Sequence, residues 1–172
     1  MLGDAFQSLQ EFLERGGPIL TWIMLLTFVM WAFILERLAY FAFAHKGVAN
    51  RAIREWGDRK DHHSWYAHAV RDQLISEVKL KADQNVELIK TLVALAPLMG
   101  LLGTVTGMIG VFDVMALTGS SDARAMSDGV SRATIPTMAG MVSALSGLIF
   151  SNQIERMAKQ RVHVLADELE VD

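Results

Sequence analysis

Three long stretches without a charged residue limit what this chain can fold into. They cover residues 16–35, 91–112 and 133–154 and hold 20, 22 and 22 residues. A helix rises about 1.5 Å per residue, so each stretch makes a helix of roughly 30 Å, the thickness of a bilayer core. Soluble helices of this length normally keep a polar face. The pattern therefore favours three transmembrane helices over the alternative, a large all-α soluble core.

The composition agrees and excludes several classes of function. Of the 172 residues 52% are hydrophobic and 20% are charged, and the mean hydropathy is +0.28. The net charge of -3 provides no general positive field for nucleic acid. The absence of cysteine excludes a disulfide scaffold, a thiolate metal site and a cysteine nucleophile.

The basic residues predict the orientation of the three spans. Residues 44–90 hold nine of the 16 Lys and Arg, and three more follow the third apolar stretch. The positive-inside rule then places the N-terminus outside and the C-terminus inside. We expect a periplasmic amphipathic helix at 1–15, transmembrane helices at 16–43, 91–117 and 132–154, a cytoplasmic helical region at 44–90, a periplasmic loop and start of helix 3 at 118–131, and a cytoplasmic C-terminal helix at 155–172.

The segment before the first span is expected to lie at the membrane surface. Its apolar residues Leu2, Phe6, Leu9 and Leu13 share one helical face, and it lacks the basic start of a signal peptide. A break is expected at Gly16-Gly17.

Two apolar stripes predict long helices outside the spans. Leu74, Val78 and Ala82 begin a stripe that runs into the second span, so one helix is expected from about residue 64 through 117. A second stripe from Ile154 to Leu169 is expected to continue the third span.

Small residues recur along one face of the second and third spans. They are Gly100, Gly103, Gly107 and Gly110 in the second span, and Ala133, Thr137, Gly140, Ala144, Gly147 and Ser151 in the third. Small residues let helix backbones approach closely in lipid. The pattern fits close packing within one subunit, or a ring of subunits whose second and third helices line a shared core. The first span is bulky, as suits a helix that faces lipid.

Polar groups within the spans are few. Thr104 and Thr137 lie on or beside the small-residue faces, where they either line a pore or bond a carbonyl one turn back. Asp113 and Arg132 lie at matching depth at the outer ends, either as an ion pair or as two unrelated interfacial charges. Glu36 and Arg37, at the inner end of the first span, are expected to be interfacial.

Enzyme and metal chemistry find little support. His62, His63 and His68 are not spaced as ligands on one helical face, so no metal site is expected. Catalytic triads, phosphate loops and paired catalytic carboxylates are absent from the sequence. We expect no cofactor and no enzymatic activity.

Two segments resemble the MotA/TolQ/ExbB proton channel family, and its ExbB branch most. They are LAPLMGLLGTVTGMI at 95–109 and GVSRATIPTMAG at 129–140. The resemblance implies an all-α membrane protein that forms a ring, with a pentamer expected, around a pore. It implies an ExbD-like single-span partner in that pore, a TonB-like protein, and proton flow that energises outer-membrane import of iron complexes. Thr104 and Thr137 match the pore threonines of the family.

One residue departs from the family pattern. ExbB and TolQ commonly carry a Glu where this chain has Arg132. Threonine hydroxyls do not load and unload a proton near neutral pH, so the titrating group would have to be an Asp of the partner. Three alternatives remain open: a TolQ-like role in envelope integrity, a non-conducting scaffold for a partner helix, and, less favoured, a small-molecule exporter.

Overall fold

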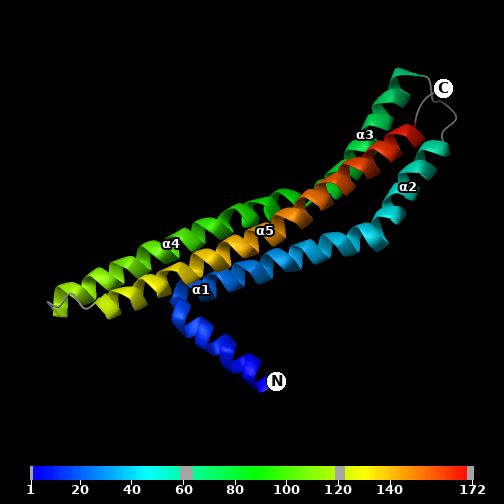
Figure 1. The fold of residues 1–172 in the computed structure, drawn as a ribbon. Coiled ribbons are helices and arrows are strands. Elements are labelled where there is room, and N and C mark those ends of the chain that lie inside the picture. The colour runs from blue at the N-terminus through cyan, green and yellow to red at the C-terminus, as the bar shows by residue number, and fades with distance from the viewer. Residues whose placement is uncertain (1, 59–63, 119–122, 170–172) are drawn as a thin grey trace. The chain divides into compact units, whose positions relative to one another are not determined.

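The computed structural model describes residues 2–58, 64–118 and 123–169, and every element within these ranges is helical (Figure 1). The elements are α1 (Leu2–Ala39), the short π-helix η1 (Tyr40–Ala44), α2 (His45–Gly57), α3 (Trp65–Asp83), α4 (Val86–Thr118) and α5 (Ala123–Glu168). Three helical stretches are long and apolar enough to cross a membrane: Gly16–Ala44, Trp65–Leu117 and Gly129–Glu168. The prediction of an all-α chain with three apolar helices of membrane-spanning length is confirmed.

Helix α1 is interrupted by a kink at Gly17. Its φ of 67° and ψ of -170° belong to a region that is nearly reserved for glycine, because a Cβ would clash there. Pro18 follows directly, where its fixed φ suits the first turn of a helix. The break expected at this point is therefore present. The side chains of Leu2, Phe6, Leu9 and Leu13, which were expected to form an apolar face, lie outside the described residues.

The prediction of one continuous helix from about residue 64 through 117 is wrong. Helix α3 ends at Asp83 and α4 starts at Val86. Between them Asn85 has a φ of 62°, in the left-handed region that Asn tolerates better than most residues. At its other end, α3 begins at the N-cap Ser64, whose hydroxyl accepts a hydrogen bond from the Ala67 amide at 3.2 Å. The apolar stripe continues past the break, which is why the periodicity concealed it.

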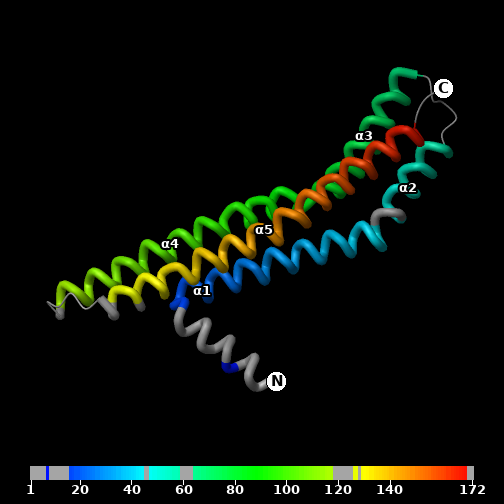
Figure 2. The backbone as a smooth tube through the Cα atoms, viewed as in Figure 1, coloured from blue at the N-terminus to red at the C-terminus, as the bar shows by residue number. Residues whose placement is uncertain are grey.

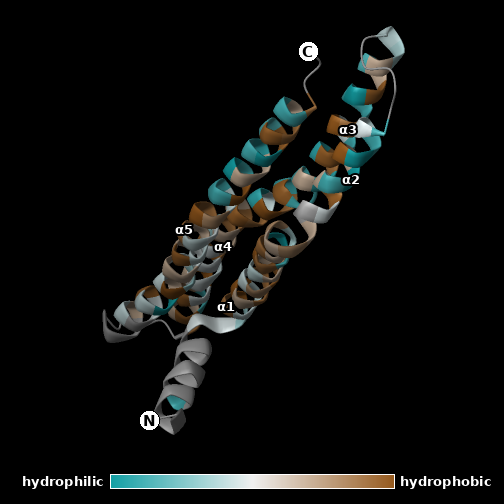
Figure 3. Ribbon diagram, turned by 90° about the vertical axis from the view of Figure 1, so that its right-hand side faces the viewer, coloured by the Kyte–Doolittle hydropathy of each residue, from teal (hydrophilic) through white to brown (hydrophobic). Residues whose placement is uncertain are grey.

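The chain divides into two compact units, each built from parts of several helices. Unit 1 holds residues 1–31 and 91–148, and unit 2 holds residues 32–90 and 149–172. In unit 1, α4 and the first part of α5 lie side by side (Figure 2). Leu20, Ile23 and Met30 of α1 are buried in this unit. Apolar residues dominate this part of the chain, whereas polar residues are more frequent on α2 and α3 (Figure 3).

Unit 2 has a core of apolar side chains from α2, α3 and the C-terminal end of α5. Its buried residues are Ala52, Trp56, Ala67, Leu74, Val78, Leu165 and Leu169. Arg71 of α3 donates hydrogen bonds to the carbonyl oxygens of Leu169 at 2.7 Å and Ala166 at 2.9 Å. These carbonyls lack helical partners at the end of α5, and a cation suits that end of the helix dipole. The stripe from Ile154 to Leu169 continues α5 as predicted.

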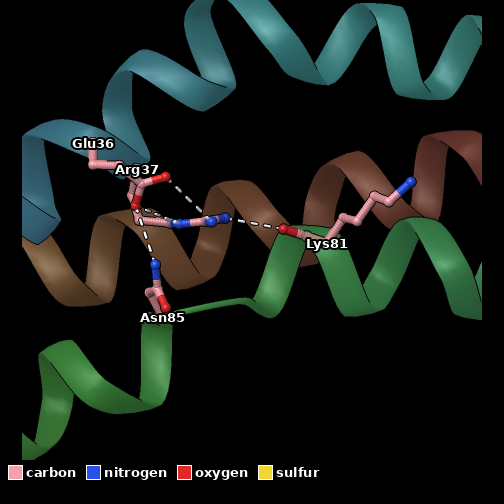
Figure 4. Close-up of polar contacts among 4 residues, drawn as sticks. All are labelled: Glu36, Arg37, Lys81 and Asn85. Carbon is pink, nitrogen blue, oxygen red and sulfur yellow. Dashed lines mark hydrogen bonds and ion pairs between the residues drawn. The ribbon is translucent and has the colours of Figure 1, made fainter.

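The break between α3 and α4 is tied to the end of α1 (Figure 4). The Arg37 guanidinium donates a hydrogen bond to the carbonyl oxygen of Lys81 at 2.9 Å and pairs with Glu36 at 3.2 Å. The Asn85 amide donates to Glu36 at 3.3 Å. Arg37 is 2% exposed and stacks 4.8 Å from the ring centre of Tyr40. Arg37 is therefore buried within unit 2, where it satisfies a carbonyl oxygen in the last turn of α3, and its place at the membrane interface stays a prediction.

Candidate functional site

Helices α4 and α5 of unit 1 touch backbone to backbone along their small residues. A methyl group on Gly100 would lie 2.9 Å from the Thr137 Cα, and one on Gly140 would lie 2.5 Å from the Ala96 carbonyl oxygen. One on Gly107 would lie 2.7 Å from the Ala133 Cβ. These gaps are too short for any side chain. We call this line of contact the α4–α5 seam.

The remaining small residues of the prediction have different surroundings. A Cβ on Gly103 would collide with the Pro136 ring, and one on Gly147 with Met30 of α1 and Val93 of α4. Ala144 is half-buried. Gly110, by contrast, would meet nothing within 4 Å and faces open space.

Thr137 is the predicted pore residue that takes part in the α4–α5 seam. Its hydroxyl donates a hydrogen bond across the helices to the Gly100 carbonyl oxygen at 2.9 Å. Thr104 instead donates to Leu101 of its own helix at 2.8 Å. In the described part of the chain no hydrogen bond joins Thr104 to Thr137. Thr137 therefore holds the seam, and the acceptor side of its oxygen stays available.

Other hydroxyls in unit 1 mostly bond their own helix. Thr106, Thr134 and Ser146 each donate to a carbonyl three or four residues back. Thr27 does this too, since its hydroxyl donates to the Ile23 carbonyl oxygen at 2.7 Å, but its oxygen also lies 2.9 Å from that of Ser143. The Thr27–Ser143 contact bridges α1 and α5. No sequence signal distinguishes Thr27, because the bond depends on which face of α1 meets α5.

The two outer charges do not meet within one chain. Asp113 and Arg132 are both exposed, and neither forms an ion pair with any residue that the structure describes. Arg132 is one of the residues that line a groove of about 650 Å³. Among the described residues its charge has no ion-pair partner.

We call this hollow the unit 1 groove. It is lined by Gly16, Gly17, Pro18 and Ile19 of α1, by Gly103, Thr106, Gly107, Gly110, Val111, Val114 and Met115 of α4, and by Met126, Gly129, Arg132 and Pro136 of α5. The lining is mostly apolar. No sequence pattern predicts this groove, because only the packed helices show where the small residues leave space.

The uncharged stretches of unit 1 contain no group that titrates near neutral pH. Residues 91–112 and 133–148 include no acidic, basic or histidine side chain. Among the described residues no three histidine or acidic side chains gather at one point as metal ligands would. His68 is exposed, and His62 and His63 lie outside the described residues. These two stretches can provide hydroxyls and carbonyls, so a group that titrates at their depth would have to come from elsewhere.

The titratable groups of unit 2 form surface ion pairs. Lys81 and Glu77 are 2.9 Å apart on α3, and the hydrogen bond and charge of Lys81 lower the pKa of the Glu77 carboxyl. Glu155 contacts Lys90 at 3.0 Å and Lys159 at 2.9 Å. These pairs lie at least partly in solvent and stabilise the helices only slightly.

The chain is similar to a known protein family and to individual proteins of known type. The profile of the MotA/TolQ/ExbB proton channel family matches residues 39–167. The chain is 37% identical over 83 residues to ExbB-like 1 of Synechocystis sp., a match that covers 46% of this chain and 33% of that protein. It is 33% identical over 82 residues to the biopolymer transport protein ExbB of Helicobacter pylori, a match that covers 48% of this chain and 57% of that protein.

The chain thus spans from about a third to somewhat over half of the length of these relatives. The family profile runs from the end of α1 to the last residues of α5. It therefore includes the break between α3 and α4 and the whole α4–α5 seam. This chain belongs to the MotA/TolQ/ExbB proton channel family.

Proposed function

We propose that this chain is the ExbB-like subunit of a motor in the bacterial inner membrane that is driven by proton flow. In this proposal an ExbD-like protein contributes one membrane helix with an Asp, and a TonB-like protein carries the work to outer-membrane receptors. The cargo would be iron complexes and similar molecules. The names of the two relatives support the ExbB type over the TolQ type, without identifying the partner of this chain.

The observation that carries the proposal is the chemistry of the α4–α5 seam. Thr137 bonds the Gly100 carbonyl, and the uncharged stretches around it hold no titratable group. A proton path along this seam therefore needs an acid from another protein, as an ExbD-like helix would supply. A chain that moved protons alone would keep a carboxylate of its own in the membrane.

The exposed surface of unit 1 supports the proposed assembly into a ring. Many large apolar side chains on α4 and α5 are exposed in the single chain, among them Leu98, Leu101, Val105, Met138, Met141 and Val142. We propose that α4 and α5 of five copies surround the pore, with Thr104 and Thr137 toward the path, while the bulky first span faces lipid. Only part of the exposed apolar surface would then face lipid.

The proposed topology keeps the predicted segments. The N-terminus and residues 118–131 lie in the periplasm, and residues 44–90 and 155–172 lie in the cytoplasm. The nine basic residues of 44–90 support this orientation. Labelling of single cysteines introduced at Gln7 and at Arg161 with a membrane-impermeant reagent tests it, since only the first should react in intact spheroplasts.

Proton flux through the reconstituted complex tests the function. The full chain and an ExbD-like protein are placed in liposomes with a pH-sensitive dye, and Thr137→Val is expected to reduce flux to the level of protein-free vesicles. Thr137→Ser keeps the hydroxyl and should retain flux. Thr134→Val is the matched control, since Thr134 is exposed and bonds only Ser131 of its own helix.

Two results would contradict the proposal. Undiminished flux through Thr137→Val would remove Thr137 from the path. A complex that conducts no protons and still supports receptor-dependent import would instead identify the chain as a scaffold for the partner helix.

A further inference from the structure

We propose that the unit 1 groove binds an acyl chain of an anionic diacyl phospholipid whose phosphate pairs with Arg132. The groove has a volume of about 650 Å³, within the range of roughly 300–1,000 Å³ that is usual for ligand pockets. The inference requires that the chain spans a membrane, but it does not depend on proton flow. The lipid site can therefore be refuted while the proposed motor function holds, and the motor function can be refuted while the lipid site holds.

The lining of the groove suits a hydrocarbon chain. Gly110 lies on its surface with nothing within 4 Å of the position of a Cβ, so the helix backbone itself is open there. Val111, Val114 and Met115 of α4 and Met126 of α5 provide apolar walls. A methylene chain gains dispersion contacts on such a surface, whereas a polar solute would find few hydrogen-bond partners.

The charge of the groove selects the headgroup. Arg132 is the only charged residue among the described ones that line it. Its guanidinium is exposed and forms no ion pair within the described part of the chain. An arginine at membrane depth is costly without a counter-charge, and a guanidinium binds phosphate with two parallel hydrogen bonds. An anionic headgroup such as phosphatidylglycerol keeps its full negative charge, whereas the amine of a zwitterionic headgroup competes for the phosphate.

A helix of a second copy is the competing occupant. Its Asp113 would bring a carboxylate, which also suits Arg132. The lipid is favoured because the groove offers a single cation at its rim and apolar walls, and lipid surrounds the chain at high concentration. The two occupants differ in what the purified protein retains.

Competition between two lipids tests the site. The full chain is incorporated in nanodiscs that contain equal amounts of phosphatidylglycerol and phosphatidylcholine with identical acyl chains, then released into mild detergent. Retained lipid is measured by native mass spectrometry. We expect the wild type to retain phosphatidylglycerol over phosphatidylcholine by about fivefold, the factor that one arginine near a membrane surface provides.

Two variants and two matched controls separate the charge from the cavity. Arg132→Gln should lose the preference between the two lipids. Gly110→Leu should lose retention of both, because the leucine fills the groove where a Cβ meets no atom. Arg156→Gln and Ala116→Leu, at exposed residues outside the lining, should behave as the wild type.

Several outcomes would overturn the inference. Equal retention of both lipids by the wild type contradicts it, as does equal behaviour of Gly110→Leu and Ala116→Leu. A change in oligomer size with Gly110→Leu at unchanged lipid retention would assign the groove to a second copy. If Gly110→Leu fails to fold, as judged by helical circular dichroism, Arg132→Gln against Arg156→Gln still decides the question.

Discussion

Unit 1 and unit 2 pack their helices with side chains of different size. In unit 1 several close contacts bring a glycine against the backbone of the neighbouring helix, as at Gly140 and the Ala96 carbonyl. In unit 2 the core includes the large side chains of Trp56, Leu165 and Leu169 beside two alanines. In a bilayer, lipid tails are as apolar as a large apolar side chain, so burying that side chain against another helix adds no hydrophobic free energy. Close approach and dispersion contacts must therefore hold the helices together. Helices in water gain from burying area, which favours bulky residues.

The two units also differ in the polar groups that join their helices. Hydroxyls make the contacts between helices in unit 1, through Thr137 and the Thr27–Ser143 bridge. Charged side chains make most of them in unit 2, where Arg37 and Arg71 donate to carbonyl oxygens at helix ends and Lys90 pairs with Glu155. A hydroxyl is the cheaper group to place in lipid, whereas a guanidinium suits a helix end close to water. The contrast leads to predictions that are specific to each unit.

The largest effect is expected from emptying the core of unit 2. Leu165→Ala removes a side chain that is 2% exposed and should lower the local stability by about 2–5 kcal/mol. Hydrogen exchange of peptides from α3 and the end of α5 measures the change. Val164→Ala at the neighbouring exposed residue is the control, and equal effects of the two would contradict a packed core at this place.

A smaller effect is expected from adding one methyl group in unit 1. Gly140→Ala should destabilise by about 1–3 kcal/mol, because its Cβ meets the Ala96 carbonyl oxygen and backbone moves only at a cost. Gly110→Ala should be neutral or stabilising by up to about 1 kcal/mol, since no atom opposes it and alanine favours the helix. Thermal unfolding in detergent followed by circular dichroism compares the two. A Gly140→Ala variant as stable as Gly110→Ala would refute the close approach at this point.

The smallest effect concerns the surface pair Glu77–Lys81 of unit 2. Lys81 lowers the pKa of Glu77, so the folded state holds this proton less tightly than the unfolded chain. The pair therefore stabilises α3 fully above the ordinary glutamate pKa of 4.5, and the contribution is lost as the pH falls through the lower folded value. The protection factors of the α3 amides, which compare each exchange rate with the intrinsic rate at the same pH, should fall in the wild type over this acidic range, and this fall should be smaller in Glu77→Gln. Identical acid profiles would show that the pair contributes nothing measurable.

Apolar periodicity predicted the helices well and their interruptions poorly. The glycine break in α1 was predictable, because Gly16-Gly17 before Pro18 is a local signal. The break at Asn85 was not, because the stripe of Val78, Ala82 and Val86 passes through it unchanged. Asn85 adopts its left-handed conformation where Glu36, far away in the sequence, accepts its side-chain hydrogen bond.

The candidate site divides in the same way. The spacing of the small residues predicted a glycine-lined face on α4 and on α5, but it did not distinguish Gly140, which touches backbone, from Gly110, which faces open space. The depth of Asp113 and Arg132 suggested a pair, and their side chains do not meet within one chain. Distances between helices depend on rotation and register, which periodicity along one helix does not contain.

The sequence by itself determined that three helices of this chain suit a bilayer, since length and the lack of charge are properties of each segment alone. It also determined the small faces and the family, through residues that are close along the chain. Only the tertiary structure decided that Thr137 bonds Gly100, that Arg37 is buried against the end of α3, and that a groove opens beside Arg132. The first two features depend on contacts between residues that are 37 and 44 apart in the sequence, and the groove depends on how three helical segments meet in unit 1. The energy of such a contact is set by the neighbour as much as by the residue.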